Sequence, residues 1–263
     1  MKKLCLLLVV AIFQLSIIQA QSVTSFNEGW KFHFGNAADA SKDFNYSISA
    51  IFHKAKVESK TPIHNKFNDS SWEAVTLPHD WAVALPFVKS DNFDVAQHGY
   101  KPVGGLFPAT SIGWYRKNFI VAKADSGQRI KIQFDGVFRD ASFWVNGFYL
   151  GNNKSGYIGE TYDITDFLNY DAENTFTVRV DATQYEGWFY EGAGIYRNVW
   201  LKKYNNIHIA QDGIFTYSKV IGNTATITNE TEIINEGFSF SSKLTVQTLL
   251  LDRAGNKVAA SEE

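Results

Sequence analysis

Cysteine is nearly absent from this sequence, and its absence excludes several kinds of chemistry. The 263 residues include one cysteine, Cys5, which lies in a segment that we interpret below as a cleaved leader. The rest of the chain has no thiol, so disulfide bonds, thiolate catalysis and cysteine-ligated metals are excluded. The six histidines are scattered without the spacing of metal ligands. We therefore expect no metal and no other cofactor.

An excess of charge of one sign is also missing. The formal net charge is −2, and the 25 basic and 27 acidic side chains are interspersed. A nucleic-acid-binding protein usually shows a basic stripe or patch, and the sequence has none. No block of like charge indicates a solvated tail. We therefore do not expect nucleic acid as a partner.

The one long apolar run lies at the N-terminus. Lys2 and Lys3 precede an apolar run over residues 4–18, and Ala20 completes a plausible cleavage site. This order is typical of a secretory signal peptide, and the run is short for a membrane span. We expect residues 1–20 to be a signal peptide, the protein to be exported to the periplasm or the medium, and no membrane attachment after cleavage. An uncleaved anchor is the alternative.

Helical periodicity is almost absent, and short strands are predicted instead. Runs rich in β-branched and aromatic residues recur between turns made of Gly, Asn and Asp. They occupy residues 130–134, 142–145, 148–150, 175–180 and 198–201. The pair Asn146-Gly147 between two of them is a strong hairpin signal. Together they predict an all-β protein with a jelly-roll β-sandwich over residues 21–205. Residues 37–66 and 91–110 interrupt this pattern and predict long irregular loops.

The texture of the sequence changes after the predicted sandwich. Further runs with the composition of strands lie at residues 207–217, 224–234 and 243–251, and residues 252–256 (DRAGN) predict a turn. They indicate the start of an immunoglobulin-like sandwich, which takes about 100 residues and seven strands. Residues 206–263 are too few for that fold. We therefore expect a partial, truncated immunoglobulin-like domain in a chain that is the front piece of something longer.

Residues 186–200 (EGWFYEGAGIYRNVW) are the most informative stretch. Rigid aromatic faces and acceptor groups are what a site needs to hold a sugar ring, whose faces are C–H and whose rim is hydroxyl. The glycines let the backbone turn and approach closely. The stretch therefore predicts contact with carbohydrate. The alternative is that its aromatic side chains pack on the sandwich and its glutamates face water.

Seven short motifs follow one another along the chain. They are residues 26–32 (FNEGWKF), 69–72 (DSSW), 77–81 (LPHDW), 113–119 (GWYRKNF), 134–137 (FDGV), 145–151 (VNGFYLG) and 194–200 (GIYRNVW). In this order they resemble the N-terminal region of glycoside hydrolase family 2, the β-galactosidase, β-mannosidase and β-glucuronidase group. The forms of residues 77–81 and 186–197 are similar to exported β-galactosidase-like members from Bacteroidetes.

The resemblance implies a galactose-binding-domain-like jelly roll, then an immunoglobulin-like domain, then a catalytic (β/α)₈ barrel that this chain lacks. Retaining glycosidases use two carboxyl groups, and in this family both are glutamates of the barrel. We therefore assign no catalytic residue. Three Asn-Glu dipeptides end in Glu28, Glu230 and Glu236 and mimic the acid/base dipeptide of the family. Because glutamate is mostly exposed, we predict that they are solvated or turn residues.

The resemblance also implies which residues contact the sugar. The loop with Glu186, Trp188, Tyr190 and Glu191 corresponds to one that reaches the barrel's pocket and holds the nonreducing sugar, often through an aspartate. This sequence has no aspartate between Glu186 and Arg197. Glu186 or Glu191 is a candidate for that role, because a carboxylate makes strong charge-assisted bonds to hydroxyls. The alignment does not choose between them.

Three further candidates lie on other loops. Asp80 either faces the sugar pocket or accepts backbone N–H bonds and holds its loop, an ordinary use of aspartate at turns. For the neighbouring His79 we favour a structural role. His98 and Lys101 lie in the glycine-rich loop that precedes residues 113–116, where family members place a sugar-contacting segment. Loops often carry function, so both are predicted contacts.

Two other sets of residues receive structural predictions. Arg116 and Arg197 recur in the family framework, and we predict internal ion pairs or loop caps for them. Trp114, Trp144 and Trp200 have strand-like spacing and are predicted to be core.

The leading hypothesis is the N-terminal, non-catalytic part of an exported glycoside hydrolase acting on β-linked sugars, inactive without its barrel, with carbohydrate as its ligand. One alternative is a free-standing carbohydrate-binding module, since jelly rolls are widely used as lectins. Another is an interaction protein that pairs through its open sandwich by strand addition. The identity of the sugar and the oligomeric state are left open.

Overall fold

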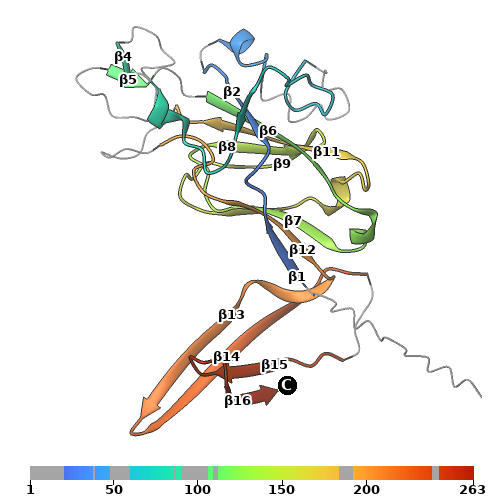
Figure 1. Ribbon diagram of the computed structural model, residues 1–263, viewed down its shortest axis with the longest axis vertical. Helices are drawn as coiled ribbons and strands as arrows, with labels where there is room; N and C mark the ends of the chain where they lie inside the picture. The colour runs from blue at the N-terminus through green and yellow to red at the C-terminus, as the bar shows by residue number, and fades with distance from the viewer. Residues whose placement is uncertain are drawn as a thin grey trace, which may run out of the picture.

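Antiparallel sheets make up most of the described chain. A computed structural model describes residues 21–37, 39–47, 60–85, 87–89, 106–108, 112–183, 192–238 and 243–263. Within these ranges there are sixteen strands and short 3-10 turns but no α-helix, which confirms the predicted all-β class (Figure 1). Over the same ranges, no helix is long and apolar enough to cross a membrane.

Ten strands form the two sheets of a β-sandwich. The six-stranded sheet has the order β3-β2-β6-β11-β8-β9, and the four-stranded sheet has the order β1-β12-β7-β10. The first contains β2 (Trp30–Phe34), β3 (Glu73–Val75), β6 (Ile112–Ile120), β8 (Ala141–Val145), β9 (Phe148–Asn153) and β11 (Glu173–Asp181). The second contains β1 (Gln21–Ser25), β7 (Arg129–Phe134), β10 (Glu160–Asp163) and β12 (Val199–Tyr204). The strands predicted within the sandwich are thus confirmed, most with longer bounds.

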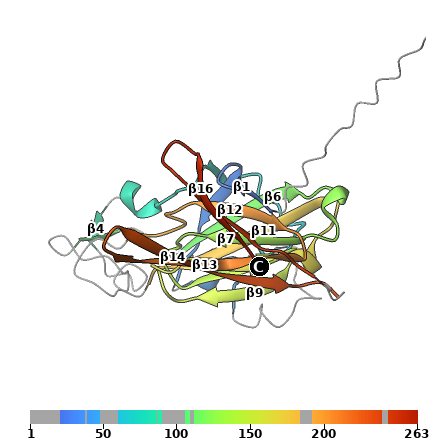
Figure 2. The same cartoon turned by 90° about the horizontal axis from the view of Figure 1, so that it is seen from below.

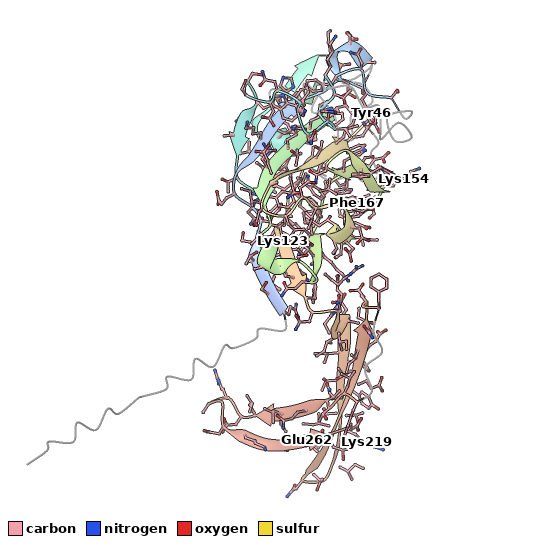
Figure 3. All side chains as sticks on the ribbon, turned by 90° about the vertical axis from the view of Figure 1, so that its right-hand side faces the viewer. Tyr46, Lys123, Lys154, Phe167, Lys219 and Glu262 are labelled. Carbon is pink, nitrogen blue, oxygen red and sulfur yellow. The ribbon has the colours of Figure 1, made fainter. Side chains whose placement is uncertain are left out.

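Side-chain alternation decides which residues form the core. In β7, Ile130, Ile132 and Phe134 are buried while the residues between them are half-buried, as the two-residue period of a strand requires. Phe134 packs against Trp30 and Phe176, with ring centroids 6.4 and 5.6 Å away. Tilted and edge-on ring contacts at such distances are favourable beyond their buried area. These three side chains belong to the buried core of the sandwich, and Figure 3 shows how densely side chains fill that part of the molecule.

A second hydrophobic cluster covers the outer face of the six-stranded sheet. Trp114 and Trp144, predicted to be core, are both buried on that face and stack with 6.1 Å between their centroids. The side chains packed against them include Phe44, Tyr46, Ile63, Phe67 and Trp72. The described part of the predicted excursion over residues 37–66 has no strand, but it is not a solvated loop. Its apolar side chains close over a sheet.

Trp200 differs from the other two tryptophans. It lies in β12 next to Val199, which is fully buried, so its side chain points to the opposite face of the four-stranded sheet. There it is half-buried, and its Nε1 donates to Asp135 Oδ2 at 2.8 Å. The prediction that Trp200 is a core residue was therefore wrong.

Turn chemistry agrees with most of the predicted turns. Asn146 and Gly147 have φ of 49° and 83°, the left-handed pair that a tight hairpin between β8 and β9 needs. After β10, which ends at Asp163, the chain turns again. The Asp163 carboxylate accepts from the backbone N–H of Thr165 at 3.0 Å, at the start of the 3-10 turn η6 (Thr165–Phe167).

Of the glycine-rich loop over residues 91–110, only residues 106–108 are described. There β4 (Phe87–Lys89) pairs with β5 (Leu106–Pro108) in an antiparallel hairpin. The prediction of an irregular loop over residues 91–110 was therefore wrong for residues 106–108, which form a strand. Residues 90–105 lie outside the described ranges.

The strands predicted after the sandwich form two hairpins, which we call the hairpin region (residues 206–238 and 243–263). β13 (Ile207–Ile221) pairs with β14 (Thr224–Asn235), and β15 (Gln247–Leu251) pairs with β16 (Lys257–Glu262). Between the last two, Asp252 Oδ1 accepts from the backbone N–H groups of Ala254 and Asn256, which confirms the predicted turn. Figure 2 shows the second hairpin crossing the first at an angle. An immunoglobulin-like domain stays a prediction, since each of these sheets has two strands.

Candidate functional site

Most of the predicted sugar contacts lie outside the described ranges. Glu186, Trp188, Tyr190 and Glu191 fall between residues 183 and 192, and His98 and Lys101 fall between residues 89 and 106. Their contact with sugar stays a prediction. The loop that carries residues 186–191 is called the aromatic loop below. Asp80 and the C-terminal base of this loop, residues 192–198, are described, and they show how the sandwich holds that base.

The base of the aromatic loop is bound on both sides by backbone hydrogen bonds. On one side, the N–H of His79 donates to the carbonyl of Ile195 at 2.8 Å, and the N–H of Trp81 donates to that of Ala193 at 3.1 Å. On the other side, Phe138 and Gly194 exchange bonds of 2.9 and 2.7 Å. The base of the loop therefore lies between residues 79–81 and Phe138 and is hydrogen-bonded to both.

Asp80 joins two of these segments. Its Oδ1 accepts from the N–H of Ala82 at 3.0 Å, as the N-cap of the 3-10 turn η4 (Trp81–Ala84), and from the N–H of Ala193 at 3.0 Å. The carboxylate thus ties residues 80–82 to the base of the aromatic loop. This is the loop-holding role that the sequence left as one of two options. A contact of Asp80 with sugar stays a prediction.

Tyr115 binds the same two segments, at His79 and Ile195, from the core of the sandwich. Burial raises its pKa well above the ordinary value, so the hydroxyl keeps its proton. It accepts from the N–H of Ile195 at 3.4 Å, donates to the carbonyl oxygen of His79 at 3.3 Å, and lies 2.8 Å from His79 Nδ1. The structure therefore gives His79 the structural role that we favoured. Sequence reasoning missed Tyr115 as an anchor, although it lies inside the quoted motif at residues 113–119.

His79 makes the stability of this site depend on pH. Burial lowers the pKa of His79 below its ordinary value of 6.5, against the opposing effect of Glu73 and Asp80. Between the two pKa values the unfolded chain binds more protons than the folded protein, so acid favours unfolding. We expect the free energy of unfolding to fall as the pH drops from 6.5 towards the lowered pKa, and to be unaffected by this group above 6.5.

The substitution His79→Asn tests this expectation. Asparagine places a hydrogen-bonding group near Tyr115 but does not titrate. The contribution of this position to the pH slope should vanish, while stability at about pH 8 stays within about 1 kcal/mol of the original. Urea unfolding at several values between about pH 5 and 8 measures both quantities. An unchanged slope would contradict the assignment.

The far side of the site is held by contacts that sequence reasoning did not anticipate. Tyr196 donates from its hydroxyl to the carbonyl of Gly156 at 2.8 Å. Asn198 accepts from Asn27 Nδ2 at 3.0 Å, and Asn27 Oδ1 accepts from the N–H of Val199 at 2.8 Å. These partners lie up to about 170 residues apart in the sequence, and no local pattern points to them.

The remaining predictions have mixed outcomes. Arg116 forms the predicted internal ion pair, with its Nε 2.9 Å from Asp69 Oδ2, while Arg197 is exposed. Glu28 and Glu230 are exposed as predicted. Glu236 is not, because its carboxylate forms ion pairs with the sandwich; the prediction for it was wrong. In the part of the chain that the structure describes, no group of three or more His, Cys, Asp or Glu side chains could hold a metal ion.

The sequence and the fold are similar to those of known proteins. The family profile described as "Glycosyl hydrolases family 2, sugar binding domain" matches residues 24–205. A β-galactosidase of Bacteroides ovatus, BoGH2A, is 34% identical over 246 residues, which are 93% of this chain and 25% of that protein. A β-glucuronidase of Formosa agariphila is 30% identical over 242 residues, 84% of this chain and 24% of that protein.

Solved structures give the same picture. A glycosyl hydrolase family 2 member from Bacteroides cellulosilyticus superposes with a TM-score of 0.69 at 28% identity, over 92% of this chain and 28% of that one. A β-glycosidase from Bacteroides vulgatus gives a TM-score of 0.69 at 30% identity, over 92% of this chain and 27% of that one. This chain therefore spans about a quarter of the length of the proteins that it matches.

Proposed function

The chain belongs to glycoside hydrolase family 2. On that premise we propose that it is the N-terminal, non-catalytic part of an exported enzyme that hydrolyses β-linked sugars, with β-galactosides as the favoured substrates. The matched region is the sugar-binding domain, a non-catalytic part of the relatives. The observation that supports the proposal most is the 34% identity with a β-galactosidase over 93% of this chain. Catalysis would come from a barrel domain of the whole protein.

We propose that the task of this part is to hold a sugar-binding loop rigidly at the mouth of the pocket. Geometry supports this: residues 192–195 are bonded to residues 79–82 on one side and to Phe138 on the other. A loop with a fixed base presents its side chains with little loss of conformational entropy on binding. Glu186 or Glu191 would accept hydroxyls of the nonreducing sugar, and Trp188 and Tyr190 would face its ring.

Export is part of the same proposal. It is supported by Lys2 and Lys3, by the apolar run over residues 4–18 and by the small residue Ala20. The absence of cysteine after Cys5 is compatible with an oxidising compartment, because no thiol there needs protection.

The purified chain tests the division of labour. We expect no turnover of a chromogenic β-galactoside or β-glucuronide by these 263 residues above a boiled control, because retaining glycosidases need two carboxyl groups about 5–5.5 Å apart and the family places them in the barrel. Turnover would contradict the proposal. Heat released on titration with oligosaccharides, without turnover, would favour the free-standing binding module instead.

A chimera tests the role of the loop. We would replace the matching quarter of the Bacteroides ovatus β-galactosidase by this chain and then introduce Glu186→Gln with Glu191→Gln. Losing a charge-assisted bond to a sugar hydroxyl should raise KM about tenfold or more. The exposed Glu232 on β14 offers the matched control, Glu232→Gln, which should leave KM unchanged. Equal KM values for all three proteins would remove the loop from the site.

A further inference from the structure

The sandwich and the hairpin region are joined by a short covalent connection. β12 ends at Tyr204 and β13 begins at Ile207, so only Asn205 and Asn206 lie between them. Figure 1 shows the two hairpins extending away from the four-stranded sheet below this connection. A two-residue link allows rotation about several backbone bonds. A second attachment is therefore needed if the two parts are to keep one orientation.

Glu236 supplies a second attachment. It follows directly after β14, and because β14 is antiparallel to β13 it returns to the start of the hairpin, where its N–H donates to the carbonyl of Asn206 at 2.8 Å. Its carboxylate reaches back to the sandwich. Lys131 Nζ lies 3.0 Å from Oε1 and 2.9 Å from Oε2, and Arg129 Nε lies 3.9 Å from Oε2.

The surroundings make this ion pair stronger than an ordinary surface pair. The side chains of Lys131 and Glu236 are 16% and 25% exposed, and solvent screens such a pair less than a fully exposed one. His208 is 4% exposed, with Nε2 3.5 Å from the Glu236 carboxylate. Its ring stacks on Tyr204 with 4.4 Å between centroids, and Lys131 Nζ lies 5.6 Å from the centre of the Tyr204 ring.

The charged groups of this cluster come from both sides of the junction, so they connect the sandwich to the hairpin region. Arg129 and Lys131 belong to β7 in the sandwich, whereas His208 and Glu236 belong to the hairpin region. Arg129 is itself held by Asp163 of β10, 3.0 Å away. Among the described residues, every ion pair that joins the sandwich to the hairpin region goes through Glu236.

We propose that Glu236 is a positioning residue that fixes the orientation of the hairpin region on the sandwich, with Lys131 as its main partner. This inference goes beyond the proposed function, since it concerns the geometry of the chain itself. It has a consequence for that function. The base of the aromatic loop is bonded to the sandwich, so a domain placed after the hairpin region would meet it in a constant place only if the junction is rigid.

Residual dipolar couplings of the whole 263-residue chain test the proposal. In the original protein the sandwich and the hairpin region should fit one common alignment tensor. In Glu236→Gln and in Lys131→Met the common fit should be lost, with weaker alignment of the hairpin region, because the ionic contact is gone in both. The double variant should show no further change, since the two residues act through one contact. Glu232→Gln, an exposed glutamate on the same strand, should behave like the original.

Fold controls separate this result from general unfolding. The amide chemical shifts of the sandwich core strands β6 and β11 should be the same in all variants, because these strands do not reach the junction. A common alignment tensor retained in both Glu236→Gln and Lys131→Met would overturn the proposal. The experiment does not involve catalysis, so a failure of the junction and a failure of the proposed hydrolase function would be told apart.

Discussion

Replacing Gly194 by alanine is expected to break the base of the aromatic loop and to destabilise the sandwich by about 3 kcal/mol or more. Gly194 has φ of 115°, a conformation that side chains rarely adopt. An added Cβ would lie 2.6 Å from the carbonyl oxygen of His79 and against the hydroxyl of Tyr115. The N–H groups of His79 and Trp81, which flank this carbonyl in the chain, are both hydrogen-bonded to the base of the loop, so the oxygen has little room to move away.

A second glycine separates the two causes. Gly127 has φ of 94° but nothing within 4 Å of an added Cβ. Gly127→Ala therefore measures the backbone strain alone, about 1–2 kcal/mol. Urea unfolding of both variants, followed by tryptophan fluorescence, gives the difference that is due to steric contact. If Gly194→Ala were no more destabilising than Gly127→Ala, the tight contact with His79 and Tyr115 would not exist in solution.

Replacing Asp69 by asparagine is the second change with a large expected effect. Asp69 Oδ2 accepts from Arg116 Nε at 2.9 Å, and the Arg116 side chain is 1% exposed. The guanidinium also donates to the carbonyl oxygens of Pro62 and His64. Removing the negative charge leaves a buried cation without its counter-ion, which costs about 3–5 kcal/mol. Because Arg116 binds residues 62–64, their packing on Trp114 and Trp144 should loosen as well.

The other cation at the same carboxylate is a built-in control. Lys31 Nζ lies 2.6 Å from Asp69 Oδ1, but its side chain is 40% exposed. Lys31→Met should therefore cost no more than about 1 kcal/mol. The apolar double replacement Asp69→Leu with Arg116→Met should be milder than Asp69→Asn, since it leaves no unpaired charge. Thermal unfolding ranks the three. A similar loss for Lys31→Met and Asp69→Asn would mean that burial does not govern this pair.

Local patterns accounted for much of the sandwich. The alternation of residues 130–134 and 175–180 predicted β7 and β11, and Asn146-Gly147 predicted the turn between β8 and β9. These signals work from sequence because each depends on neighbours one or two positions away. The same rule failed for Trp200: strand spacing tells which residues share a face, but not which face is buried.

The candidate site was less predictable. The sequence marked the aromatic loop and Asp80, but it left open whether Asp80 holds the loop or faces sugar. The N–H of Ala193, 113 positions from Asp80 in the chain, shows the first role. Glu236 was predicted to be solvated because glutamate usually is, and only the return of β14 to the sandwich brings it to Lys131.

The sequence by itself therefore determined the all-β class, the positions of most strands and turns, and membership of the glycosidase family. These depend on composition, on short motifs and on the order of neighbouring residues. Only the tertiary structure decided which charges are paired, which loop bases are held by hydrogen bonds, and how the sandwich and the hairpin region are joined. Those contacts form between residues that are tens to more than a hundred positions apart. Their partners exist only after the chain has folded, when burial makes an unpaired charge or N–H too costly to leave alone.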